Sequence, residues 1–203
     1  MMRWTSTPLR VLVKAAYGLT SYQMAGWPNS LDSDKWNVDA KTEGPTTTKQ
    51  KYEMLQTLIV ERFGLKFHRE MRDIEGYTLV AAKNGPKLRE VKEGEVSSSP
   101  AGTTIQRGLV IGHQVRMMDW VGLFSAELGC PFEDNTGLTG RYDFKLEWSP
   151  DERQPNSFGE PGDPNGPSIF AAIQEQLGLK LEVKKFRVEM FVIDHIDRDP
   201  TPN

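Results

Sequence analysis

Three histidines and the carboxylates beside them are the residues of this chain best suited to acid–base or metal chemistry. His195 lies in the run Ile193-Asp194-His195-Ile196-Asp197, and His68 and His113 complete the set. No two histidines have the spacing of zinc ligands on one helix face. All three fall in expected strands, where neighbours such as Asp194 and His195 point to opposite faces. We therefore interpret these histidines as solvated strand positions and predict no metal site.

Other sequence patterns for catalysis are also missing. Asn37 and Asp143 occupy matching motif positions, but an amide and a carboxylate do not suit catalysis by two carboxylates. We expect each of them to bond a neighbouring backbone group instead. Gly137–Gly140 lacks the Lys-Ser or Lys-Thr of a phosphate loop, Cys130 has no base near it in sequence, and no GxSxG elbow occurs. We predict no catalytic residue and no cofactor.

Aromatic residues in surface-prone positions are the candidates for binding. Trp27 precedes Pro28, Trp148 ends an expected strand, and Phe158 lies in a segment rich in Pro and Gly. The simpler interpretation is that these rings anchor loops and the core. The alternative is that they contact a protein or peptide partner, because large aromatics on loops are common contact anchors.

The charge of the chain restricts its partners. Its 203 residues include 25 Lys and Arg and 28 Asp and Glu, which gives a net charge of -3. Without a polybasic cluster we expect no nucleic-acid binding. No apolar run approaches the roughly 20 residues that span a bilayer, so we expect no membrane insertion. The length suits one large domain or two small ones.

The elements that would position these residues come in two similar series. Hydrophobic spacing, caps and turn residues define them. The first series is a helix at Pro8–Tyr17, a strand at Lys35–Lys41, a helix at Lys49–Phe63, and a hairpin of Lys66–Arg72 and Gly76–Lys83. The second is a strand at Gly108–Val115, a helix at Met117–Leu128, a strand at Arg141–Trp148, a helix from Ser168 to Leu177, and a hairpin of Leu179–Val183 and Val188–Ile193.

Matching motifs indicate that the two series are copies. Lys35-Trp36-Asn37-Val38 resembles Arg141-Tyr142-Asp143-Phe144, and Phe63-Gly64-Leu65 resembles Leu177-Gly178-Leu179. Fixed-order similarity of this kind predicts duplicated units. We expect an α+β fold of two pseudo-repeats, each with two helices packed on a mixed or antiparallel sheet.

The boundaries of the predicted pseudo-repeats follow from composition. The first spans 1–88 and the second 105–197, separated by a polar linker at 89–104 and followed by a tail at 198–203. The second contains an insertion at 149–167, rich in Pro and Gly. No counterpart of Gly108–Val115 is evident upstream of Trp4. We therefore expect the first pseudo-repeat to lack its first strand and to have an open sheet edge there.

Longer motifs extend over nearly the whole chain. They are Ala16–Gly18, Met54–Gln56, Glu61–Phe63, Leu79–Leu88, Asn135–Phe144, Gly166–Phe170, Gln174–Glu182 and Val192–His195. With these motifs the chain resembles a family of unknown function that is expanded in soil acidobacteria, for which no catalytic residue is assigned. Its element order and helix-Gly-Leu-strand junction are also weakly similar to the small protein-binding modules at the N-termini of secretins and TonB-dependent receptors.

The resemblance implies an extracytoplasmic protein, periplasmic or secreted. Members of the family usually begin with a signal peptide, and related domains are fused to membrane-bound sensor peptidases of the BlaR type. This sequence has no signal peptide, which we interpret as a late start. We expect a non-enzymatic binding or sensing module for a protein, peptide or envelope ligand. The alternatives are a hydrolase between the repeats that uses His195, Asp194 and His68, and a structural envelope protein.

Overall fold

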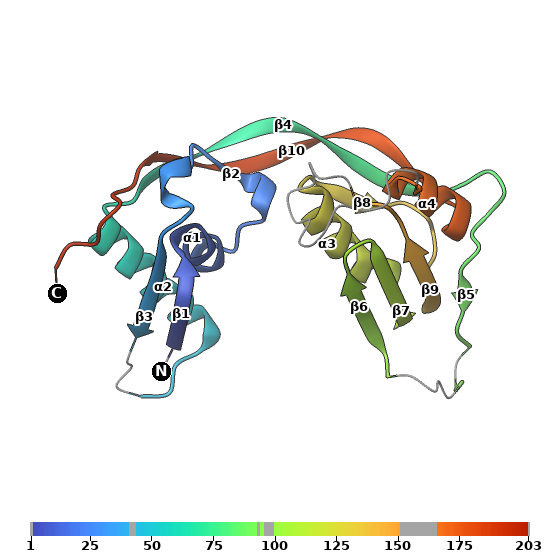
Figure 1. Ribbon diagram of the computed structural model, residues 1–203, viewed down its shortest axis with the longest axis horizontal. Coiled ribbons are helices and arrows are strands. Elements are labelled where there is room, and N and C mark those ends of the chain that lie inside the picture. The colour runs from blue at the N-terminus through green and yellow to red at the C-terminus, as the bar shows by residue number, and fades with distance from the viewer. Residues whose placement is uncertain (1, 41–43, 93, 96–99, 151–165, 203) are drawn as a thin grey trace. The chain divides into compact units, whose positions relative to one another are not determined.

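Helices and strands alternate along the chain, which gives the expected α+β fold (Figure 1). The computed structural model describes residues 2–40, 44–92, 94–95, 100–150 and 166–202. The chain divides into two compact units. Unit 1 comprises the residues up to Arg72 and those from Arg187 onward, and unit 2 comprises Asp73–Phe186.

Unit 1 is a two-stranded antiparallel sheet with two helices and pieces of a second sheet. Its elements are β1 (Met2–Pro8), α1 (Leu9–Tyr17), short 3-10 turns at Ser21–Gln23 and Asn29–Leu31, β2 (Met24–Ala25), β3 (Lys35–Ala40), α2 (Thr48–Phe63), the first part of β4 (Lys66–Ala81) and the last part of β10 (Leu179–His195). Thr47 caps α2, because its side chain accepts the N–H of Gln50 and Gln50 in turn bonds the backbone N–H of Thr47. The sheet order is β1-β3.

The core of unit 1 lies between these helices and strands. Leu9, Leu12, Val13 and Ala16 form the buried face of α1, and Phe67 of β4 stacks on Phe191 of β10 with ring centroids 4.0 Å apart. Each fully buried aliphatic or aromatic side chain stabilises the fold by roughly 1.5–3 kcal/mol. Both long strands are therefore needed to complete this core.

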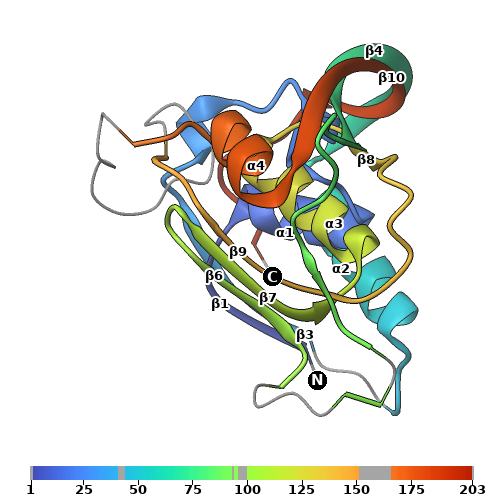
Figure 2. The same cartoon turned by 90° about the vertical axis from the view of Figure 1, so that its right-hand side faces the viewer.

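Unit 2 has a larger sheet. It contains the second part of β4, β5 (Arg89–Glu90), β6 (Gly102–Gln106), β7 (Leu109–Val115), α3 (Met117–Leu128), β8 (Phe132–Asp134), β9 (Tyr142–Glu147), α4 (Ile169–Leu177) and the first part of β10. The sheet order is β5-β9-β7-β6, with antiparallel neighbours throughout. Helices α3 and α4 lie on one face of this sheet (Figure 2), and the rings of Trp120 and Phe144 meet there at 3.6 Å between centroids.

The two expected hairpins are wrong, because β4 and β10 are each one continuous strand. The first hairpin was expected to turn at Asp73–Glu75, just before Gly76. Gly76 is close to another segment: a Cβ there would meet the carbonyl oxygen of Pro131 at 2.2 Å, and the same oxygen accepts the N–H of Tyr77 at 3.0 Å. Gly76 therefore admits the chain that leads into β8, which pairs in parallel with β4.

The expectation that the first half lacks its first strand is also corrected, because β1 pairs with β3. A register shift lies between Trp4 and Thr7, and Ser6 has φ +51°. This bulge interrupts the alternation by which a strand is recognised from sequence. Two further strands, β5 and β6, fall within or across the expected linker at 89–104. Most of the expected insertion at 149–167 lies outside the described residues, and the pseudo-repeat boundaries stay a prediction.

Asn37 and Asp143 stabilise two matching bulges. Asn37 Oδ1 accepts the N–H of Ser6 at 2.8 Å in unit 1, and Asp143 Oδ1 accepts the N–H of Gln114 at 2.8 Å in unit 2. Gln114 has φ +53° and lies in the register shift between β7 and β9. The expected bonding of these side chains to neighbouring backbone is confirmed.

Removing either acceptor should destabilise the protein. We expect Asn37→Ala to lower the free energy of unfolding by about 1 kcal/mol, because the bulge N–H loses its partner. Asp143→Ala should cost about 2 kcal/mol, because its bond is half-buried and Arg89 also loses an ion pair. Urea unfolding measures both, with Asn37→Asp as the control that keeps the acceptor. An unchanged midpoint for Asn37→Ala would contradict this role.

Gly76→Ala tests the continuous strand and its close neighbour. The new methyl group would overlap backbone at Pro131, so we expect a loss of about 1–3 kcal/mol in thermal or urea unfolding. Gly122 in α3 is the matched control, since a Cβ there meets nothing within 4 Å. Gly122→Ala should stabilise by about 0.5–1 kcal/mol. Equal effects of the two changes would rule out this packing.

Candidate functional site

A groove on unit 1 combines aromatic surface with positive charge. Two hollows of about 520 and 290 Å³ share Trp4 and Tyr52 as lining residues. We call them together the β1–α2 groove. The side chains used in the argument below are Arg3, Trp4, Val11, Lys14, Lys51 and Tyr52.

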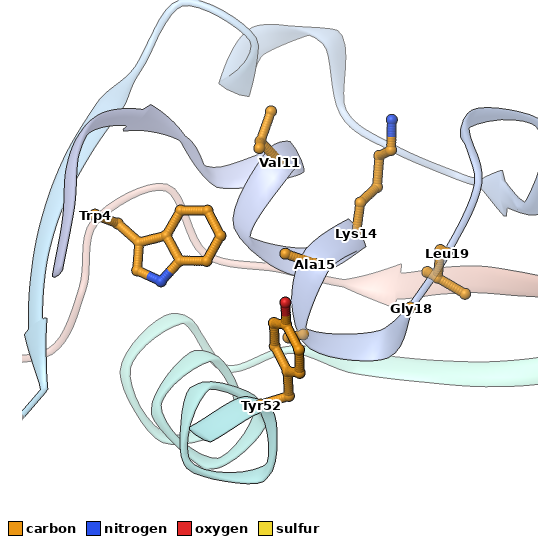
Figure 3. A pocket seen from close by; sticks show the side chains of 8 residues that line it. Trp4, Val11, Lys14, Ala15, Gly18, Leu19 and Tyr52 are labelled. Atoms are coloured by element: carbon orange, nitrogen blue, oxygen red, sulfur yellow. The ribbon is translucent and has the colours of Figure 1, made fainter. Parts of the chain in front are cut away.

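Three elements position these side chains. Trp4 reaches from β1 and Tyr52 from α2 toward the same side of α1, where Val11 and Lys14 lie (Figure 3). Since α1 buries its opposite face in the core, Val11 stays 43% exposed, and Tyr52 is 38% exposed. The groove therefore presents apolar surface that the unit itself does not cover.

The indole N–H of Trp4 is an unused donor. Its Nε1 is buried and has no hydrogen-bond partner among the described residues. Trp36, Trp120 and Trp148 share this property, but Trp120 and Trp148 lie in the core of unit 2, whereas Trp4 and Trp36 line hollows. A buried donor without a partner costs roughly 1–3 kcal/mol.

The charge of the groove is positive. Arg3, Lys14 and Lys51 line it, and no carboxylate does. Arg3 pairs with Asp39 at 2.6 Å, and Lys14 Nζ donates to Ser21 Oγ at 2.7 Å. Burial, and after it the charge of Arg10, lowers the pKa of Lys14. Lys51 pairs with no carboxylate in the part of the chain that the structure describes, so its charge is available to a ligand.

A third hollow, of about 630 Å³, lies on the β3 side of unit 1 and is bordered by the C-terminal tail. Trp36 and Phe63 line it together with Pro200–Pro202. Arg62 fixes the tail, because its Nη1 donates to the carbonyl of Thr201 at 3.2 Å and its own carbonyl accepts the Thr201 N–H at 2.8 Å. The chain's own residues thus border this hollow, whereas no tail residue lines the β1–α2 groove.

The histidines form two separate pairs with carboxylates. His68 Nδ1 lies 2.8 Å from Asp194 Oδ1, and His195 Nε2 lies 3.0 Å from Asp197 Oδ1. The side chains of His68 and Asp194 are 51% and 47% exposed. None of these residues lines the three hollows. Across the described ranges, no cluster of three or more His, Cys, Asp or Glu side chains could hold a metal ion.

The candidate contact residues from the sequence do not meet at one site. Trp27 is half-buried, packs against the core of unit 1 and donates its Nε1–H to Asp32 at 2.9 Å. Trp148, expected at the surface, is 6% exposed in the core of unit 2. Phe158 lies outside the described residues. Sequence reasoning missed Trp4 and Tyr52. Tyr52 has the helical spacing of the buried residues of α2, which indicates a core position, and Trp4 precedes the first expected helix.

Comparison with known proteins places the chain among relatives of unknown function. A search of curated proteins and a search of solved structures each find no match. No helix within the described ranges has the length and apolar character needed to cross a membrane. A family model described as a protein of unknown function, DUF3738, matches residues 10–196, from α1 to just beyond β10. The chain therefore belongs to the DUF3738 family.

Proposed function

We propose that this protein is an extracytoplasmic binding module that holds an acidic, partly apolar segment of a protein or peptide in the β1–α2 groove. One observation carries the proposal: three cations and no carboxylate line an aromatic groove on a chain whose net charge is -3. Complementary charge guides association and selects the partner. Exposed aromatic residues supply contact area at low entropic cost.

The shape and chemistry of the groove favour a chain-like ligand. Its two hollows share Trp4 and Tyr52, so one ligand can contact both. The methylene groups of acidic side chains would cover Val11 and the two rings, and their carboxylates would pair with Lys51 and Lys14. Val11 and Tyr52 are exposed in unit 1, and Lys14 would add a carboxylate to its bond with Ser21.

We also propose that the two halves are an internal duplication and that only the first copy is adapted for binding. The matched bulges at Ser6 and Gln114 support the duplication. Superposing the bulges places Gly112 opposite Trp4, and aligning Gly64 with Gly178 places Gly166 opposite Tyr52. Both groove aromatics are thus glycines in the second half.

The extracytoplasmic location and the sensing role rest on resemblance. Relatives in the acidobacterial family usually look exported, and fusion to sensor peptidases of the BlaR type suits a domain that detects an envelope ligand. The weak similarity to the N-terminal modules of secretins and TonB-dependent receptors supports a protein partner. A structural envelope protein is the third hypothesis, which no contact in the described residues favours over binding.

A hydrolase is the second candidate, and the 2.8 Å contact between His68 and Asp194 is the observation that favours it. Both side chains are about half exposed on neighbouring strands, outside the three hollows. Efficient acid–base catalysis uses a pocket that positions the substrate and limits water. Ester or peptide hydrolysis that is lost in His68→Ala would favour this alternative over binding.

The binding proposal is tested with a defined probe. We expect the full chain to bind a fluorescein-labelled octapeptide of alternating Glu and Val, measured by fluorescence anisotropy, and to bind the matching Lys-Val peptide at least about tenfold more weakly. Lys51→Glu should weaken binding of the Glu-Val peptide about tenfold, because an attraction worth about 0.5–1 kcal/mol becomes a repulsion. Tyr52→Ala should weaken it about tenfold or more.

Lys185→Glu is the matched control for charge. Lys185 is exposed on β10 and does not line the groove, so the same change in net charge is made at a residue outside it. We expect it to alter affinity by less than about twofold. Equal affinity for the two peptides, or an equal effect of Lys185→Glu and Lys51→Glu, would refute the proposal.

A further inference from the structure

The outer edge of β1 is unpaired in the described residues. The sheet of unit 1 contains only β1 and β3 there, so each strand has one side without a strand partner (Figure 1). An unpaired edge presents a row of backbone donors and acceptors that can pair with another chain. Unit 2 differs, because β6 and β5 flank the central pair β7 and β9.

In unit 2, the corresponding edge pairs with a further strand. Strand β6 pairs antiparallel with β7 over Leu109–His113 and stops just before the bulge at Gln114. The bulge of β1 is at Ser6, where Trp4 opposite Val38 matches Gly112 opposite Phe144. Residues 2–5 of β1 therefore correspond to the part of β7 that carries β6. The same edge in unit 1 has no such strand among the described residues.

The β1–α2 groove lies on the side of this free edge. Arg3 and Trp4 of β1 line the groove, and no residue of β3 does. Residues Trp36–Asp39 of β3 line the other hollow, with the C-terminal tail. Helix α2 contributes to both hollows: Lys51 and Tyr52 line the groove with residues of β1, whereas Leu58, Arg62 and Phe63 line the other hollow with residues of β3.

The features that usually prevent strand addition at a sheet edge are missing from residues 2–5 of β1. Bulges and prolines discourage strand addition. In β1 they are Ser6 and Pro8, at the end of the strand that leads into α1. The preceding residues carry one cation, Arg3, which already pairs with Asp39. The edge from residue 2 to residue 5 thus contains neither a bulge nor a proline.

From this arrangement we infer that the partner binds by strand addition: an extended acidic segment pairs its backbone with residues 2–5 of β1 and directs alternate side chains into the β1–α2 groove. The inference rests on the proposed function, because it specifies how the same groove is filled. Main-chain hydrogen bonds supply affinity in this mode of recognition, and pockets for alternate side chains supply specificity. The partner segment is a β-strand of another polypeptide with carboxylates on one face. Lys51 and Lys14 provide complementary charge for these carboxylates.

The test uses the Glu-Val octapeptide in two N-methylated forms, one methylated at every Glu and the other at every Val. In a strand, all Glu N–H groups lie on one edge and all Val N–H groups on the other, so only one set can face β1. We expect one form to bind the full chain at least about tenfold more weakly than the unmethylated peptide and the other to stay within about threefold. The backbone amides among residues 2–5 that point to the free edge of β1 should also exchange at least about tenfold more slowly in the complex.

The outcomes separate this inference from the proposed function. If both methylated forms bind as well as the parent peptide, or both lose affinity equally, strand addition is wrong while binding through the groove stands. If the unmethylated peptide binds no better than its Lys-Val counterpart, both proposals fail. Tyr52→Ala serves as the side-chain control: it should weaken all three peptides by the same factor, because it removes a groove contact and leaves the edge of β1 intact.

Discussion

Two long strands hold this structure together, because each completes two cores. Phe67 of β4 and Phe191 of β10 stack in unit 1, and Leu79 of β4 and Leu179 of β10 are buried in unit 2. Two short strands also pair in parallel with these long strands: β2 pairs with β10, and β8 pairs with β4. Neither half of the sequence therefore contains every strand that its unit needs. The groove depends on this constraint, since α1 and α2 are held in place by a core that β4 and β10 complete.

Local signals in the sequence were sufficient to predict the helices and the bulge contacts. The helices expected at Met117–Leu128 and Lys49–Phe63 match α3 and α2 to within one residue, because apolar spacing and a terminal glycine define them. Asn37 and Asp143 were recognisable because a short polar side chain in a strand has few uses other than bonding backbone. These features depend on residues close in sequence or on paired motifs.

Features set by distant contacts were not predictable. A hairpin was expected just before Gly76, yet β4 continues through this glycine, which allows the close approach of Pro131, 55 positions later in the sequence. Trp148 ends a strand in a polar stretch, but the core of unit 2 encloses it. The β1–α2 groove needs Trp4 and Tyr52 from elements far apart in the chain. Its charge is likewise invisible in a composition whose acidic and basic residues nearly balance.

Nuclear magnetic resonance of the full chain can show whether the Glu-Val peptide binds at the β1 side of unit 1. The indole N–H signal of Trp4 is a probe of the groove, because this N–H has no hydrogen-bond partner in the described residues. On titration with the Glu-Val octapeptide, we expect shifts of this signal and of the backbone amides of Arg3, Thr5, Lys51 and Tyr52. Saturating peptide that leaves these signals unchanged, or that shifts the Trp36 indole beside the tail instead, would contradict binding in the β1–α2 groove.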